Sequence, residues 1–121
     1  SRDPSTLRRL AADIQPDAFT LLLYHPPDLI YEASLVGIDL YLCGHTHGGQ
    51  IRMPLYGAIV TASAFGKQFE AGKYQLGPTV LYVSRGLGME GGFAPRARFL
   101  APPEIVVVDL IPARVANESG V

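Results

Sequence analysis

The sequence predicts an α/β fold, in which strands alternate with helices along the chain. Two nearly apolar runs, at residues 19–24 and 39–43, have the length and composition of buried strands. Between them, residues 28–36 have the pattern of a short helix, and the order strand, helix, strand is typical of this fold class. The chain has 121 residues, 48% hydrophobic and 17% charged, which suits one small globular domain.

The first helix and the first strand have clear ends in the sequence. Residues 3–14 are expected to form a helix capped by Asp3 or Ser5, because its apolar side chains recur on one face. Pro16 ends this helix. The strand that follows is expected to end at His25, because the next two residues are prolines and cannot continue it.

The second helix lies between the two apolar runs. It is expected over residues 28–36, beginning near Pro27, because proline is favoured in the first turn of a helix. Gly37 is expected at its end, where glycine commonly terminates helices. The strand at residues 39–43 then completes the strand, helix, strand unit.

The second half of the chain predicts a hairpin and two further strands. Residues 69–75 are expected to form a hairpin that turns near Ala71 and Gly72. Residues 79–84 and 104–111 are each expected to form a strand. No internal repeat or linker divides the sequence, so we expect these elements to belong to one domain.

The composition excludes some classes of function. A net charge of −1 gives no support for a general nucleic-acid-binding surface, which requires a basic excess. Cys43 is the only cysteine, so no internal disulfide can form. No apolar run reaches about 18 residues, so no transmembrane helix is expected within this sequence.

All three histidines of the chain follow expected strands. His25 follows the first strand, and His45 and His47 follow the second. Ligands of α/β sheets bind outside the carboxyl ends of the strands, so the three imidazoles converge there if the two strands are neighbours. Imidazole suits zinc, iron, manganese and copper, and a His-x-His pair can face one metal or two adjacent metals. The histidines therefore predict a metal site.

Glycines and arginines near the histidines are candidates for substrate contacts. Gly44, Gly48 and Gly49 flank the His-x-His pair, where the absence of side chains lets the backbone bend and a substrate approach. Arg52 and Arg85 can add positive charge near the same histidines and contact an anionic substrate. A structural hydrogen-bonding role for Arg85 is an equal alternative.

Other side chains have simpler interpretations. His25 on its own is more often a turn residue than a ligand, whereas the His-x-His pair is the stronger signal. Cys43 ends an apolar strand and is expected to act as a small buried hydrophobe rather than as a metal ligand. The stretch "GLGMEGG" lacks the dinucleotide-binding fingerprint. Five carboxylates are expected at the surface or at a sheet edge: Asp28, Asp39, Glu70, Glu104 and Asp109.

Longer motifs resemble a known family. The block "GHTH" is similar to the closing Gly-His-x-His block of the calcineurin-like metallophosphoesterase superfamily, and His25 in "LLLYHPP" resembles the histidine block that precedes it. The stretches "GGQIR", "SRGLG" and "PPEI" narrow the resemblance to a bacterial branch, the YaeI- and YkuE-like phosphodiesterases. The resemblance covers residues 17–110.

The resemblance implies a fold, an activity and a metal centre. The fold would be a sandwich of two mixed β-sheets flanked by helices, and the activity would be hydrolysis of phosphodiester or phosphomonoester bonds. Two divalent ions (Mn, Zn or Fe) would be held by histidines and bridged by an aspartate. In that pattern His25 and His45 bind one metal and His47 binds the other. The implied partner is a phosphate-ester substrate.

Several motifs of the family do not occur in this sequence. There is no Asp-x-His, no Gly-Asp and no Gly-Asn-His, which in the family supply the remaining metal ligands and the catalytic histidine. We therefore expect residues 1–121 to form the C-terminal half of the domain, without its N-terminal half, and to be inactive alone. The alternative is a non-catalytic metal-binding or interaction module that retains only this half. Family members often carry an N-terminal membrane or export segment, so the resemblance is compatible with a membrane-associated or cell-envelope protein and does not assign a cellular location.

Overall fold

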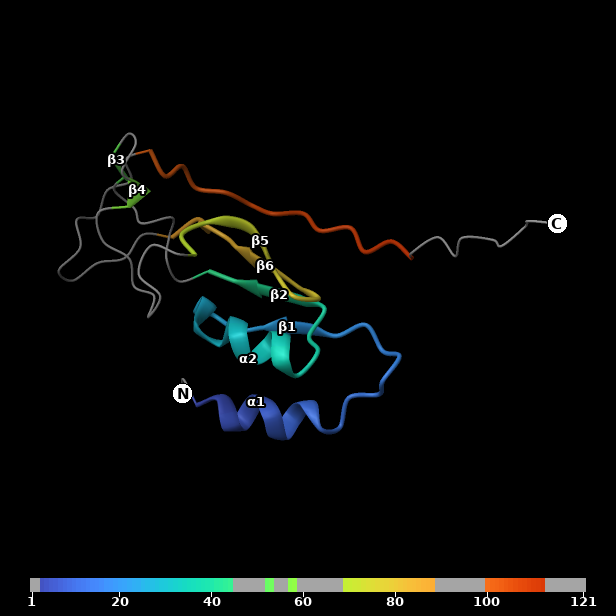
Figure 1. The fold of residues 1–121 in the computed structure, drawn as a ribbon. Coiled ribbons are helices and arrows are strands. Elements are labelled where there is room, and N and C mark those ends of the chain that lie inside the picture. Colours follow the sequence, from blue (N-terminus) through green and yellow to red (C-terminus); the bar gives the residue numbers. More distant parts are fainter. Residues whose placement is uncertain (1–2, 45–51, 54–56, 59–68, 89–99, 113–121) are drawn as a thin grey trace.

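The structure is a computed structural model that describes residues 3–44, 52–53, 57–58, 69–88 and 100–112. Within these residues the chain is α/β, as the sequence predicts, with a four-stranded sheet and helices on one of its faces (Figure 1). The elements follow in the order α1 (Pro4–Ala11), β1 (Leu21–Leu23), the 3₁₀ helix η1 (Pro27–Leu29), α2 (Ile30–Leu35), β2 (Leu40–Cys43), β3 (Arg52–Met53), β4 (Gly57–Ala58), β5 (Gly72–Leu76) and β6 (Thr79–Val83).

The sheet brings the expected strands together as neighbours. Its strand order is β1-β2-β6-β5, with β1, β2 and β6 parallel and β5 antiparallel to β6. Tyr41 in the middle of β2 is in register with Leu22 of β1 and with Leu81 of β6. The carboxyl ends of the three parallel strands therefore lie at the same edge of the sheet.

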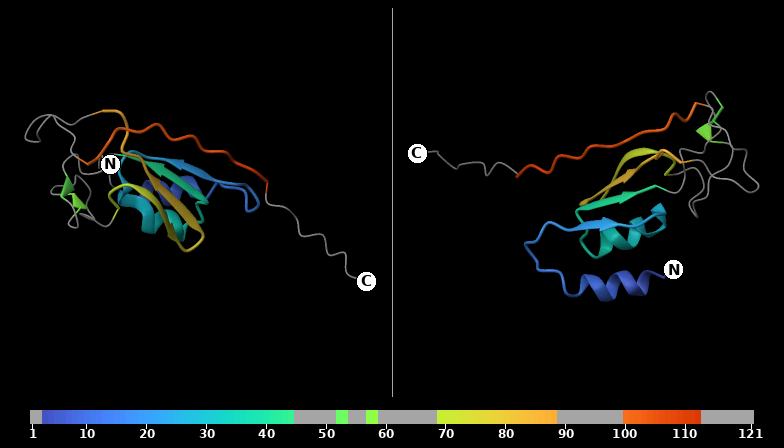
Figure 2. Two further views of the ribbon diagram at one scale, coloured as in Figure 1. Left: turned by 90° about the horizontal axis from the view of Figure 1, so that it is seen from above. Right: turned by 180° about the vertical axis from the view of Figure 1, so that it is seen from behind.

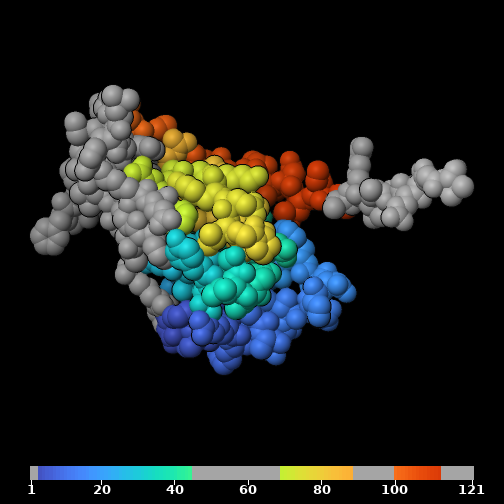
Figure 3. Space-filling model, viewed as in Figure 1, coloured from blue at the N-terminus to red at the C-terminus, as the bar shows by residue number. Residues whose placement is uncertain are grey.

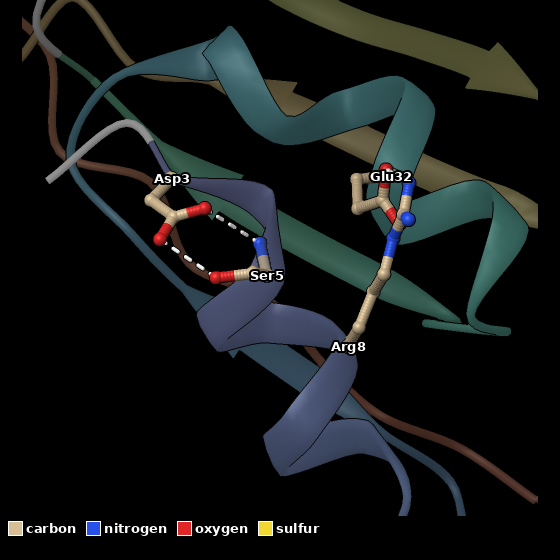
Figure 4. Close-up of polar contacts among 4 residues, drawn as sticks. All are labelled: Asp3, Ser5, Arg8 and Glu32. Atoms are coloured by element: carbon tan, nitrogen blue, oxygen red, sulfur yellow. Dashed lines mark hydrogen bonds and ion pairs between the residues drawn. The ribbon is translucent and has the colours of Figure 1, made fainter.

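The first helix begins where the sequence predicts. The Asp3 side chain caps α1 and accepts a hydrogen bond from the backbone N–H of Ser5 at 2.9 Å (Figure 4). The helix ends at Ala11, so residues 12–14 lie beyond it rather than within it. Arg8 forms an ion pair with Glu32, which ties α1 to α2 (Figure 4).

The second helix is divided into two short pieces. Residues 27–29 form the 3₁₀ helix η1, and α2 continues from Ile30 to Leu35. Pro27 occupies the first turn and is buried. Gly37 follows the end of α2 at a φ of 81°, a left-handed conformation that favours glycine. The strand, helix, strand unit is therefore present with the expected caps.

The core lies between the sheet and the helices. Tyr41 of β2 and Leu81 of β6 are fully buried, as is Ile30 of α2, which packs against the sheet. The Tyr41 hydroxyl donates a hydrogen bond to the carbonyl oxygen of Pro26, so the buried phenol is paired. These contacts fix the turn after β1 to the centre of the sheet. Figure 3 shows α1 and α2 packed closely below the β5–β6 hairpin.

The expected hairpin at residues 69–75 is wrong. Residues 72–76 form β5 as one strand, which pairs with β6, and the turn falls at Gly77 and Pro78. Gly77 has a φ of 54°, as a two-residue hairpin turn requires, whereas a proline can occupy the next position. Phe69 packs edge-on against Tyr74, with ring centroids 5.1 Å apart, so this apolar pair anchors the start of β5.

The expected strand at residues 104–111 is also wrong. This segment belongs to no strand, and it runs as an extended chain on the side of the sheet away from the helices (Figures 1 and 2). Most of its apolar side chains are exposed, including Val107 at 84% and Ile111 at 83%. An apolar, β-branched sequence favours a strand only where a neighbouring strand accepts its hydrogen bonds, and the described sheet supplies none.

Two further expectations concern architecture. Outside the four-stranded sheet, β3 and β4 form a two-stranded antiparallel ribbon, and the sandwich of two mixed sheets stays a prediction. Among the described residues, no helix has the length and apolar character needed to span a membrane.

Candidate metal centre

Three residues that follow parallel strands meet at the carboxyl edge of the sheet. They are His25 after β1, Gly44 after β2 and Ser84 after β6. The backbone N–H of Gly44 donates to the carbonyl oxygen of His25 at 2.8 Å, and that of Ser84 donates to Cys43 at 2.8 Å. The strand pairing therefore continues one residue beyond β2 and β6 and two residues beyond β1, and it holds the three residues side by side.

The His25 side chain lies against Gly44. A Cβ atom on Gly44 would lie 3.8 Å from Cε1 and 3.9 Å from Nδ1 of the His25 ring. His25 is exposed, so its imidazole is accessible to a ligand at this edge. His45 is the next residue after Gly44, but His45 and His47 lie outside the described residues. The structure brings His25 beside Gly44, the residue before the His-x-His block in sequence, and the convergence of all three imidazoles stays a prediction.

The glycine at this position provides space rather than an unusual backbone. The φ of Gly44 is outside the left-handed region, so its backbone conformation is open to other residues. A Cβ would contact the carbonyl oxygen of Ser84 at 3.6 Å and the His25 ring. Of the two roles expected for the glycines, close approach fits Gly44 and sharp bending does not. Gly48 and Gly49 lie outside the described residues.

Cys43 packs as the sequence predicts for a small apolar side chain. It is half-buried against the core beneath the strand end. Burial, with a smaller contribution from the negative charge of Asp28, raises the pKa of the Cys43 thiol to about 12. The side chain therefore carries a neutral thiol at neutral pH in this environment.

Asp28 is less exposed than the sequence suggests. It is half-buried in η1, and its Oδ2 atom is buried. Burial raises the pKa of both Tyr41 and Cys43, and the negative charge of Asp28 adds a smaller contribution in the same direction. In the sequence, only its position three residues after His25, next to two prolines, relates Asp28 to this end of the sheet.

The other carboxylates expected at the surface also differ. Glu70 is buried, with 9% exposure. Asp39 is half-buried and accepts a hydrogen bond from the backbone of Thr20 at 2.7 Å, at the opposite end of the strands from His25. Asp109 is exposed, as expected. A hollow of about 460 Å³ lies at that opposite end, where Thr20 and Asp39 contribute to its lining, so it is separate from the His25 edge.

Glu104 is bound to Arg85 rather than placed at a strand edge. Its Oε2 atom accepts hydrogen bonds from Nε of Arg85 at 2.8 Å and from Nη2. Its Oε1 atom accepts from the backbone N–H of Arg85 at 2.9 Å. This pairing matches the structural alternative considered for Arg85. Of Arg52 only the backbone, in β3, belongs to the described part of the chain.

A metal could use His25, but the described residues do not complete a site. Within the ranges that the structure covers, no group of three or more His, Cys, Asp or Glu side chains lies close enough to hold a metal ion. His25 offers an imidazole at an accessible strand end, with open space at Gly44. This donor suits zinc, manganese or iron. The geometry therefore fits one ligand of a metal centre.

Comparison with curated proteins identifies bacterial relatives. The chain is 46% identical over 105 residues to the uncharacterized metallophosphoesterase YkuE of Bacillus subtilis. The alignment covers 87% of this chain and 34% of that protein. It is 37% identical over 91 residues to the phosphodiesterase YaeI of Escherichia coli, covering 75% of this chain and 32% of that protein. It is 31% identical over 108 residues to the UDP-2,3-diacylglucosamine pyrophosphatase LpxG of Chlamydia trachomatis. That alignment covers 84% of this chain and 32% of the relative.

These matches cover most of this chain and a smaller part of each relative. The chain spans about a third of the length of these curated relatives. No protein-family model matches the chain, and no solved structure matches it. The sequence similarity extends over most of the chain, including the residues that form the strand ends around His25 and Gly44. The chain is therefore a relative of the bacterial metallophosphoesterases that include YkuE and YaeI.

Proposed function

We propose that the chain is part of a metal-dependent phosphoesterase that hydrolyses phosphodiester or phosphomonoester bonds. The observation that carries this proposal is the His25 imidazole, which packs against Gly44 one residue before the His-x-His block. The names of the relatives support it, since they include metallophosphoesterases, a phosphodiesterase and a pyrophosphatase. The activity is assigned to the full-length protein, because the chain spans about a third of those relatives.

Within that protein, residues 1–121 would form one part of the catalytic domain. The lengths of the relatives leave room for the remaining ligands and for a second sheet. The exposed apolar side chains of β1 support this arrangement, because Leu21 is 41% and Leu23 is 71% exposed in the described structure. Large apolar side chains at the surface mark faces that other structure covers.

Three histidines are proposed as metal ligands: His25, His45 and His47. Two divalent ions of the Mn, Zn or Fe type, when bound, supply Lewis acidity at the phosphoryl oxygens. The chain itself would provide neutral imidazole nitrogens as ligands and open space at Gly44 for the phosphate. Arg52 and Arg85 would contact the anionic phosphoryl oxygens, for which a guanidinium is well suited.

The proposal is tested by hydrolysis of bis-p-nitrophenyl phosphate by the full-length protein. We expect turnover with Mn²⁺ or Zn²⁺, loss of turnover after treatment with a chelator, and recovery when the metal is restored. Turnover that is insensitive to the chelator would contradict the proposal. Metal binding without turnover would instead favour a non-catalytic metal-binding module.

Substitution of Gly44 is expected to affect activity according to side-chain size. Among the described residues, a Cβ at this position makes only ordinary contacts, at 3.6 Å to Ser84 and 3.8 Å to the His25 ring, so Gly44→Ala should remain active. Gly44→Val adds two methyl groups beside the His25 ring and the Ser84 carbonyl oxygen, so we expect crowding of the imidazole and a fall in kcat/KM of roughly tenfold or more.

The measurement compares both variants with the wild-type protein, and thermal unfolding verifies that each is folded. Gly44→Ala is the matched control for Gly44→Val. If folded Gly44→Val hydrolysed the substrate as fast as the wild type, the His25 ring would not be needed in the position described here.

A further inference from the structure

Arg85 and Glu104 form a connection between the end of β6 and the extended segment that follows Ala101. Both oxygens of the Glu104 carboxylate are used, one by the Arg85 guanidinium and the other by the Arg85 backbone N–H. In return, the backbone N–H of Glu104 donates to the carbonyl oxygen of Gly86 at 3.1 Å. We call this set of contacts the Arg85–Glu104 latch.

The latch lies next to the candidate metal centre. Ser84, the residue before Arg85, donates its backbone N–H to Cys43, and its carbonyl oxygen would lie 3.6 Å from a Cβ on Gly44. His25 lies on the same side of Gly44 at similar distance. A shift of the loop that contains Arg85 would therefore change the space around the His25 imidazole.

The latch is also partly buried. The side chain of Arg85 is 27% exposed and that of Glu104 is 15% exposed. Ala101, shortly before Glu104, is fully buried, which fixes the start of the segment against the rest of the molecule. In a second ion pair among the described residues, between Arg8 and Glu32, the Arg8 side chain is 63% exposed and that of Glu32 is 11% exposed. The two glutamates are similarly buried, and the arginine of the latch is the less exposed of the two arginines.

We propose that Glu104 is a positioning residue of the phosphoester site, which holds Arg85 and its loop in place for binding of the anionic substrate. This role rests on the proposed function. A guanidinium binds a phosphate well when its planar fork is already oriented, because little side-chain freedom is then lost. Glu104 binds one edge of the Arg85 guanidinium and the Arg85 backbone N–H. It therefore fixes the direction of the Arg85 side chain and the position of the neighbouring Ser84 carbonyl beside Gly44.

The test uses Glu104→Gln in the full-length protein. Glutamine keeps an oxygen for the Arg85 backbone N–H but loses the charge that holds the guanidinium. We expect KM for bis-p-nitrophenyl phosphate to rise roughly tenfold while kcat stays within about threefold, as for loss of binding shared by ground and transition states. Glu32→Gln, which removes the partner of Arg8, is the matched control and should leave KM unchanged.

A double-mutant cycle separates positioning from general stability. If Glu104 acts through Arg85, Glu104→Gln should add less than about twofold to KM in an Arg85→Ala background. Equal loss in both backgrounds, or an unchanged KM in Glu104→Gln, would overturn the proposal. A wild-type protein without metal-dependent hydrolysis would overturn the proposed function itself, and the positioning role with it.

Discussion

Replacing His25 or His45 with alanine is expected to reduce metal-dependent hydrolysis of bis-p-nitrophenyl phosphate by at least about 100-fold, because each change removes a proposed metal ligand. The His25 imidazole lies exposed at the carboxyl end of β1, beside Gly44. Alanine leaves no donor atom there. The measurement combines steady-state hydrolysis with metal content per chain, and both are expected to fall.

A control is needed because any substitution can lower activity through misfolding. Gln75→Ala changes an exposed side chain of β5 and should leave hydrolysis and metal content unchanged. Thermal unfolding of the histidine variants should resemble that of the metal-free wild type. Wild-type activity in folded His25→Ala would exclude His25 as a ligand, whatever the role of the other two histidines.

Residues 1–121 expressed alone are expected to show no phosphoesterase turnover. Two divalent ions a few ångströms apart repel strongly, and neutral imidazoles supply no charge that offsets this repulsion. Among the described residues, no carboxylates gather with His25 into a group that could hold a metal. One ion could bind weakly, with water in its remaining positions.

Residues 1–121 on their own are also expected to associate in solution. Large apolar side chains are exposed along the segment after the sheet, where Ile105 is 78% and Val107 is 84% exposed, and Leu23 of β1 is 71% exposed. Exposed apolar surface and an edge strand favour aggregation. Size-exclusion chromatography, metal analysis and hydrolysis assays test both expectations. Two tightly bound ions per chain, with turnover equal to that of the full-length protein, would contradict them.

The fold class and the first half of the structure could be predicted because the signals there are local. Apolar runs mark β1 and β2, and proline and glycine mark the ends of the helix between them. The position of the hairpin turn does not follow from local sequence, because Gly72 and Gly77 each permit a left-handed turn and only the pairing of β5 with β6 selects Gly77. The segment at residues 104–111 has a strand-like sequence, but its pairing depends on a neighbour that local sequence does not reveal.

In the candidate site, too, some features follow from local sequence and others depend on tertiary packing. The position of His25 at a strand end follows from the residues around it, and its contact with Gly44 follows once β1 and β2 are neighbours. The Arg85–Glu104 latch joins residues 19 positions apart, so no short pattern indicates it. The burial of Asp28 also depends on tertiary packing, since a carboxylate after two prolines is equally consistent with an exposed turn.

We expect His25 to bind metal at the carboxyl edge of β1, β2 and β6. The most direct measurement is anomalous X-ray diffraction from crystals of the full-length protein loaded with Mn²⁺. We expect an anomalous peak at coordination distance, about 2 Å, from an imidazole nitrogen of His25, next to Gly44. A peak located elsewhere, with the His25 ring bound to no metal, would contradict it.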